Sequence, residues 1–139
     1  MNKINGGFTL IELMVTLVVL SILVAIAYPS YSAFTARSQR ATAKTELTRI
    51  AQLQERFFID NRTYATLAQL GFAGNTVGVN RNGTEVAVGA GIYNVTITPA
   101  PTAINFIVQA TATGTQISDT GCTTLAISAI GVQSPADCW

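Results

Sequence analysis

The sequence places a single carboxylate inside a long apolar stretch. From Phe8 to Ala27 the chain has about the twenty residues that a helix needs to cross a bilayer core. Glu12 is the single ionisable side chain among them. An unpaired charge at the centre of such a helix costs roughly 2.5 to 3.5 kcal/mol, and less near its end, so a partner cation is expected. Cleavage after Gly7 would give Phe8 an α-amino group. A neighbouring helix shifted by about one turn would place that cation near Glu12.

The stretch from Gly7 to Leu13 resembles, position for position, the N-terminal signature of the type IV pilins. In that family a short polar leader ends in Gly, and Phe-Thr-Leu-Ile-Glu follows at the head of an apolar helix. The resemblance implies that a prepilin peptidase cuts after Gly7 and that Phe8 becomes N-methylated. It also implies that Glu12 supports docking between subunits during filament assembly, and that Pro29 bends the helix.

Two other interpretations of this N-terminus remain open. In the first it is a secretory signal, with Lys3 as its positive mark and Ala25–Ala27 as the cleavage site, so that the mature chain starts at Tyr28. The length of the apolar run, the carboxylate of Glu12 and the Gly-Gly before Phe8 argue against it. In the second it is a plain single-span anchor whose carboxylate reaches the lipid headgroups. The residue that begins the mature chain separates the three interpretations.

The two cysteines of the chain, Cys122 and Cys138, favour a disulfide. An even cysteine count in an exported chain is typical of pairing in an oxidising compartment, and the type IV pilins likewise end in a cysteine pair. A disulfide that closes a loop of about fifteen residues would contribute roughly 3 kcal/mol and hold the C-terminus on the sheet. Redox catalysis is not favoured, because the spacing is not C-x-x-C.

The composition excludes several classes of function. The 139 residues suffice for one small domain beyond the N-terminal helix. Eight Lys and Arg minus Lys3 of the leader leave seven, against seven Asp and Glu, so no broad basic field indicates general nucleic-acid binding. With no His and two Cys, a His-based triad and a zinc site of four Cys or His ligands are excluded within one chain. We expect no enzymatic site, no cofactor and no metal.

The hydrophobic pattern predicts an α+β fold, in which one long helix packs on a three- to four-stranded antiparallel sheet. After the apolar half, an amphipathic pattern without Gly or Pro continues from Ser32 to about Ile59. Its basic residues Arg37, Arg40, Lys44 and Arg49 are expected to form a solvated face or salt bridges between subunits, rather than a polyanion site. The segments that we expect are the leader 1–7, the helix 8–59 with its membrane or filament-core half 8–27, the head 60–139, its connecting loop 60–91, the sheet 92–128 and the disulfide-bounded region 122–138.

Alternation of branched or aromatic residues with polar ones predicts the strands. Asn80–Gly83 indicates a turn between strands at Thr76–Val79 and Thr84–Val88. Three clearer strands follow, at Ile92–Thr98, Ile104–Thr113 and Thr123–Ser128.

The resemblance implies a structural function as a subunit of a type IV pilus, which serves adhesion, twitching motility and DNA uptake. The expected partners are other pilin copies, prepilin peptidase, the inner-membrane pilus assembly machinery and the inner membrane itself. The chain would lie in the bacterial inner membrane with its N-terminus cytoplasmic and its head periplasmic, and then in the extracellular pilus.

Two alternatives stay open. One is a minor pilin acting as an adhesive or DNA-binding module through exposed loop residues such as Arg62, Tyr64 and Arg81, although the charge balance gives DNA binding no support. The other is a pseudopilin of type II secretion. The cysteine pair favours a pilin, since the major pseudopilins usually carry a calcium loop and the tail here has only Asp119 and Asp137 as acids.

Overall fold

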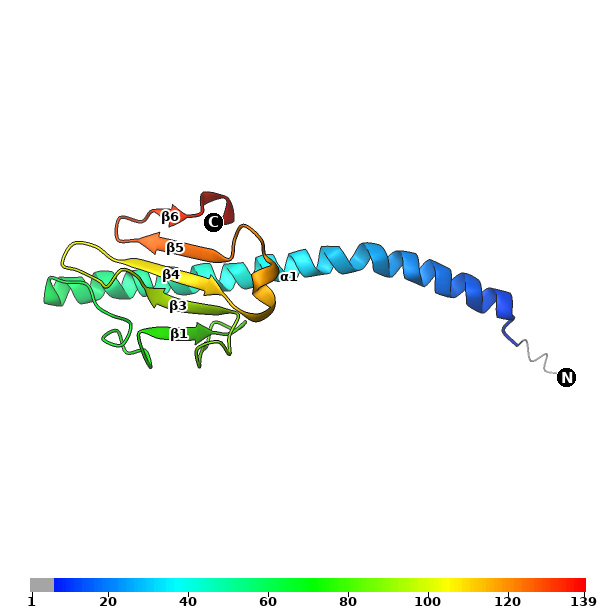
Figure 1. Cartoon of the computed structure of the whole chain (residues 1–139), viewed down its shortest axis with the longest axis horizontal. Coiled ribbons are helices and arrows are strands. Elements are labelled where there is room, and N and C mark those ends of the chain that lie inside the picture. Colours follow the sequence, from blue (N-terminus) through cyan, green and yellow to red (C-terminus); the bar gives the residue numbers. More distant parts are fainter. Residues whose placement is uncertain (1–6) are drawn as a thin grey trace, which may run out of the picture. The chain divides into compact units, whose positions relative to one another are not determined.

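A computed structural model of the protein describes residues 7–139, and Lys3 with the rest of the predicted leader before Gly7 lies outside the described residues. The chain divides into two compact units, Met1–Thr35 and Ala36–Trp139, and we call the second the head unit. The elements in order (Figure 1) are α1 (Leu10–Asn61), β1 (Thr76–Val79), β2 (Glu85–Val86), β3 (Tyr93–Ile97), β4 (Ile107–Ala112), the 3-10 helix η1 (Gly114–Ser118), β5 (Thr124–Ser128), β6 (Gln133–Ser134) and the 3-10 helix η2 (Ala136–Cys138).

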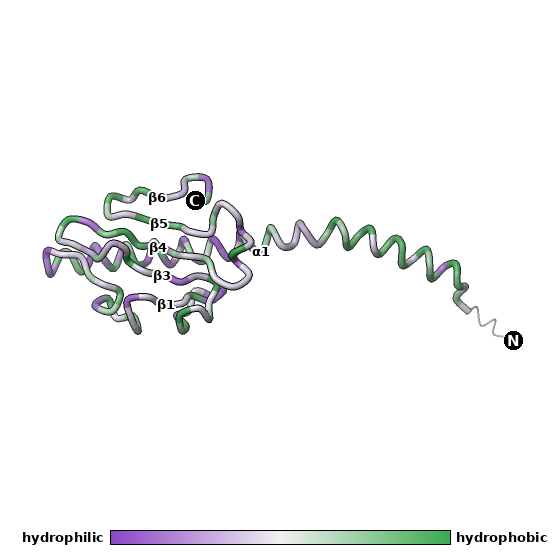
Figure 2. Tube along the Cα trace, in the orientation of Figure 1, coloured by the Kyte–Doolittle hydropathy of each residue, from purple (hydrophilic) through white to green (hydrophobic). Residues whose placement is uncertain are grey.

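The described part of the first unit is mainly the apolar beginning of α1, which is green along most of its length in Figure 2. The residues from Gly7 to Phe34 are all exposed. Hydroxyl groups here donate back to carbonyls of the preceding turn, as Thr16 Oγ1 does to the Leu13 carbonyl at 2.8 Å. This leaves few polar groups without an internal partner, as a helix in lipid requires. Pro29 lies inside α1, and the helix continues on both sides of it.

The later part of α1, from Ala36 on, is amphipathic and packs against the sheet of the head unit. Ala43, Leu47 and Ile50 follow each other at helical spacing and are fully buried. α1 ends at Asn61, two residues beyond the predicted limit. A helix packed on one face of an antiparallel sheet is the α+β arrangement that the sequence predicts, and it is confirmed.

The sheet is larger than predicted. It has six antiparallel strands in the order β2-β1-β3-β4-β5-β6, and not three or four. The predicted hairpin forms as β1 and β2, within the segment 60–91 that was expected to be a loop. β2 is shorter than the predicted strand Thr84–Val88. The sequence pattern misses β6, because two residues are too few to show alternation.

The inner face of the sheet is built in rows across the strands. In one row Val77 pairs with Val95, Val95 with Ala110, and Ala110 with Leu125. All four side chains are buried, which gives α1 a continuous apolar surface to pack on.

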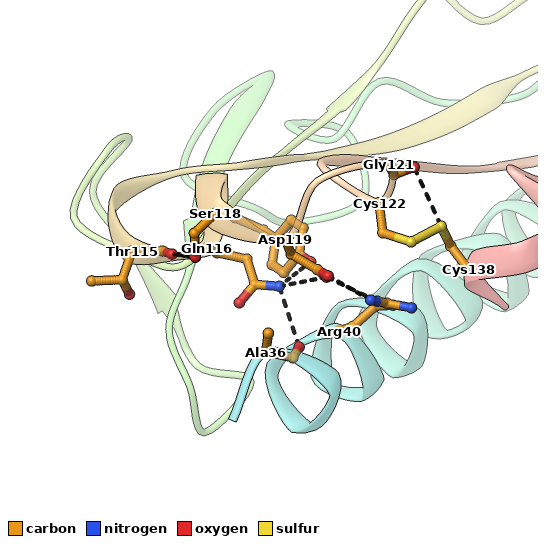
Figure 3. A network of polar contacts seen from close by, with 10 residues as sticks. Ala36, Arg40, Thr115, Gln116, Ser118, Asp119, Gly121, Cys122 and Cys138 are labelled. Carbon is orange, nitrogen blue, oxygen red and sulfur yellow. Dashed lines mark hydrogen bonds and ion pairs between the residues drawn. A yellow bond between two sulfur atoms is a disulfide. The ribbon is translucent and has the colours of Figure 1, made fainter. Parts of the chain in front are cut away.

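A polar network attaches the start of the packed part of α1 to the segment after β4 (Figure 3). Arg40 Nε and Nη2 donate to Asp119 Oδ2 and Oδ1 at 2.9 and 2.6 Å. Gln116 Nε2 donates to the Ala36 carbonyl at 3.2 Å, to the Tyr93 hydroxyl at 3.0 Å and to Asp119 Oδ2 at 3.0 Å. Burial raises the pKa of Tyr93 above its ordinary value. The network therefore holds a neutral phenol beside a tightly paired carboxylate.

A second buried contact fixes the chain where it leaves α1. Gln54 is fully buried; its Nε2 donates to the Ala65 carbonyl at 2.6 Å, and its Oε1 accepts from the Ala65 amide at 2.8 Å. Next to it, Tyr64 stacks on Phe58 and meets Phe106 edge-on, with ring centroids 4.8 and 4.7 Å apart.

The disulfide between Cys122 and Cys138 is present, with the two Cα atoms 5.6 Å apart. It joins the chain before β5 to the tail after β6. The indole Nε1 of Trp139 donates to the Ser134 carbonyl at 3.2 Å. The tail is thus held at two points beside the last strands.

We expect Gln54→Leu to lower the free energy of unfolding by about 2–4 kcal/mol, because the leucine keeps the volume but leaves the buried amide and carbonyl of Ala65 without partners. Denaturant unfolding of the full chain in an uncharged detergent measures it. The matched control is Gln52→Leu on the exposed face of α1, with an expected change within about 0.5 kcal/mol. Equal losses in both variants would contradict the assignment.

Candidate functional sites

The predicted cleavage site lies before α1 and is exposed. Among the described residues, and apart from its chain neighbours, none has an atom within 4 Å of where a Cβ on Gly7 would stand, and Phe8 is 79% exposed. A peptidase therefore meets no steric obstacle from the described part of the chain.

Glu12 lies in the first turn of α1 and is exposed. Its amide donates to Thr9 Oγ1 at 3.3 Å, so that Thr9 caps the helix. Within residues 7–139 the Glu12 carboxylate makes no ion pair. A cation from another chain can therefore reach it, and the positive end of the helix dipole favours its charge.

Thr9 is a residue of this site that the sequence argument missed. The spacing Thr9-x-x-Glu12 is the pattern of a capping box, in which the first residue bonds the amide of the last. The pattern was available in the sequence, since it precedes an apolar helix as capping boxes do.

The other residues that the sequence predicts to be functional do not form one site with Glu12. Pro29 stands alone within α1, and Cys122 and Cys138 belong to the head unit. Among the described residues no group of three or more His, Cys, Asp or Glu side chains could hold a metal ion.

The head unit has a hollow of about 440 Å³ at the β1–β2 turn. Asn80 Oδ1 accepts from the amides of Asn82 and Thr84 at 2.9 and 3.0 Å, so the turn is fixed from within. Thr42 of α1 donates to the Arg81 carbonyl at 3.3 Å. The side chains of Arg81 and Asn82 stay exposed. We call this space the turn hollow; it is lined by Asn80, Arg81, Asn82, Ala90, Gly91, Ile92, Thr113 and Thr115.

A second hollow, of about 580 Å³, crosses the exposed face of α1 beside the C-terminal tail. Of its two basic side chains, Arg49 is already neutralised: its Nε and Nη2 donate to the Glu46 carboxylate at 2.9 and 2.5 Å. This hydrogen bonding raises the pKa of Arg49, and its guanidinium lies 5.1 Å from the centre of the Phe72 ring. We call this space the Trp139 groove; it is lined by Lys44, Thr45, Thr48, Arg49, Gln52, Gln133 and Trp139.

These contacts correct two expectations. Arg40 and Arg49 form salt bridges within the chain, to Asp119 and Glu46, which the sequence argument did not include. Tyr64 is not a free loop aromatic, because it is packed between two phenylalanine rings. Sequence alone does not separate a loop aromatic that packs inward from one that points to solvent.

Two protein families match the chain. Residues 2–28 match the prokaryotic N-terminal methylation motif. A helix with an apolar first half, packed later on an antiparallel sheet with a C-terminal disulfide, agrees with a type IV pilin.

Residues 29–126 match the family described as type IV minor pilin ComP, DNA uptake sequence receptor, and the chain belongs to that family. No individual curated protein matched the chain.

The chain is therefore a subunit of a type IV pilus, and pilins are structural proteins. Its apolar helix anchors it in the inner membrane before assembly into the extracellular pilus. Assembly brings it together with the pilus machinery and with other pilins.

Proposed function

We propose that this chain is a low-abundance pilus subunit whose head unit binds DNA during uptake. The observation that carries the proposal is the family match over residues 29–126, because it covers most of the head unit and not only the common N-terminal motif. The same match favours a minor pilin over a pseudopilin of type II secretion, since the family description is that of a pilin.

Processing and assembly follow from the N-terminal site. Prepilin peptidase would remove residues 1–7 and methylate the new amino group of Phe8. The apolar residues 8–27, all exposed in the single chain, would then pass from lipid to contacts with neighbouring helices. Glu12 would pair with the amino group of Phe8 on a neighbour and so set the register between copies.

The turn hollow is the place where we propose that DNA first contacts the head unit. Its lining has no acidic side chain, and it offers the Arg81 guanidinium for a phosphate together with the amide of Asn82 and the hydroxyl of Thr115. The turn is fixed by Asn80 and by Thr42, so little order needs to be gained on binding.

Mass spectrometry of the mature chain tests the processing. We expect the N-terminal peptide to begin at Phe8 and to carry one added methyl group. The control is a Gly7→Trp chain, whose bulky residue at the cut should leave the leader attached. A mature chain that begins at Tyr28, or an uncut one, would contradict the proposal.

We expect Glu12→Gln to leave membrane insertion intact and to lower the copies in sheared surface pili about tenfold, equal to about 1.4 kcal/mol of lost pairing. Quantitative immunoblots of membrane and pilus fractions measure both. The control is Glu55→Gln, an exposed carboxylate on α1 in the head unit that should change neither fraction. Normal copies of the Glu12 variant in pili would exclude the role.

We expect Arg81→Gln to weaken binding of duplex DNA by the full chain about three- to tenfold, and to reduce the slope of log K against log salt by about 0.9, the value for one phosphate contact. Anisotropy of labelled DNA at several salt concentrations measures it. The control is Arg56→Gln, an exposed arginine of α1 that lines neither hollow. An unchanged slope would remove Arg81 from the contact.

A further inference from the structure

The Trp139 groove combines side chains that the type IV pilus function described so far does not use. It brings the last residue of the sequence beside the exposed face of α1, and it is lined by an indole, two cations, two amides and two hydroxyls. No acidic side chain lines it.

The two cations of the groove differ in what they can still bind. Arg49 is paired with Glu46 and lies over the Phe72 ring, so it lines the groove but is not available to bind an anion. Lys44 is half-buried and makes no ion pair among residues 7–139. Its ammonium can therefore exchange water for an incoming anion.

The indole of Trp139 is held in place before any ligand arrives. Its ring nitrogen donates to the Ser134 carbonyl, and the preceding residue Cys138 is buried and tied to Cys122. Trp139 packs in part against the core and remains partly exposed. A fixed, partly exposed ring gives a flat apolar surface at a small entropic cost.

We propose that the Trp139 groove is a second nucleic-acid contact of the head unit. A backbone phosphate binds the Lys44 ammonium, and a sugar or base face packs on Trp139. The amides of Gln52 and Gln133 lie along the same lining, within the groove that would hold base or sugar edges. This inference rests on the proposed DNA-binding function and adds a contact separate from the turn hollow, with which it shares no lining residue.

The choice of a nucleic acid over an acidic peptide follows from the proposed DNA-binding function, because a peptide also offers a carboxylate for Lys44, side chains for the indole and backbone groups for the amides. A strand of nucleic acid brings a phosphate, an apolar face and polar edges at once, and those are the three kinds of partner that the groove offers.

The test uses the fact that Trp139 is the one tryptophan of the chain. Intrinsic fluorescence of the full chain in an uncharged detergent therefore reports on the groove. We expect a short DNA duplex at low salt to change the emission in a saturable way. The midpoint should agree with the affinity measured by anisotropy of labelled DNA.

Two variants extend the test. Lys44→Gln should weaken DNA binding about three- to tenfold and reduce the salt slope by about 0.9. Trp139→Phe keeps an aromatic ring but should weaken binding about two- to fivefold with an unchanged salt slope, because no charge is lost. Arg56→Gln, at an exposed arginine of α1 outside both hollows, is the control and should match the unmodified chain. Circular dichroism and the unfolding midpoint establish that the variants are folded.

The outcomes separate the groove from the proposed function. If the chain binds DNA but its Trp139 emission does not change and Lys44→Gln binds normally, the groove proposal is overturned while DNA binding stands. If the unmodified chain binds no DNA at low salt, both proposals fail. If an acidic peptide or a carboxylated polysaccharide changes the emission and DNA does not, the groove serves another class of ligand and the inference is wrong.

Discussion

The first part of α1 cannot remain in water at low cost, and the rest of the molecule depends on that constraint. None of its membrane-length apolar window is buried within the chain, and Phe8, Leu10 and Ile11 are among the most exposed side chains. Burying a large apolar side chain contributes about 1.5–3 kcal/mol, so lipid or neighbouring helices must cover this surface. Membrane anchoring and pilus assembly are therefore two ways of meeting one requirement.

The same helix meets a different requirement after Ala36. From there on its apolar residues are confined to one face of the helix, and the opposite face is polar. Ala43, Leu47 and Ile50 bury against the rows of the sheet, while Arg40 pairs with Asp119 beside them. A partly buried ion pair adds little net stability, but it fixes which turn of the helix meets the sheet. One continuous helix thus connects a surface made for lipid with a surface made for a protein core.

Much of this could be read from the sequence, because the signals were long. A twenty-residue apolar run with one carboxylate, and a helical period sustained to Ile59, leave few alternatives. What the sequence did not show depends on short elements or on distant partners. Strand β6 has two residues, and the Arg40–Asp119 pair joins positions 79 residues apart. The Trp139 groove likewise needs the folded tail, which no local pattern in α1 predicts.

The two ends of the sheet have a consequence for how copies meet. At each edge the paired strand is only two residues long, β2 on one side and β6 on the other. Short border strands offer few free backbone groups for a strand of another molecule, so crowded heads gain little from joining edge to edge. Polymerisation is thereby steered away from cross-β aggregation, even where many heads are held close together at a cell surface.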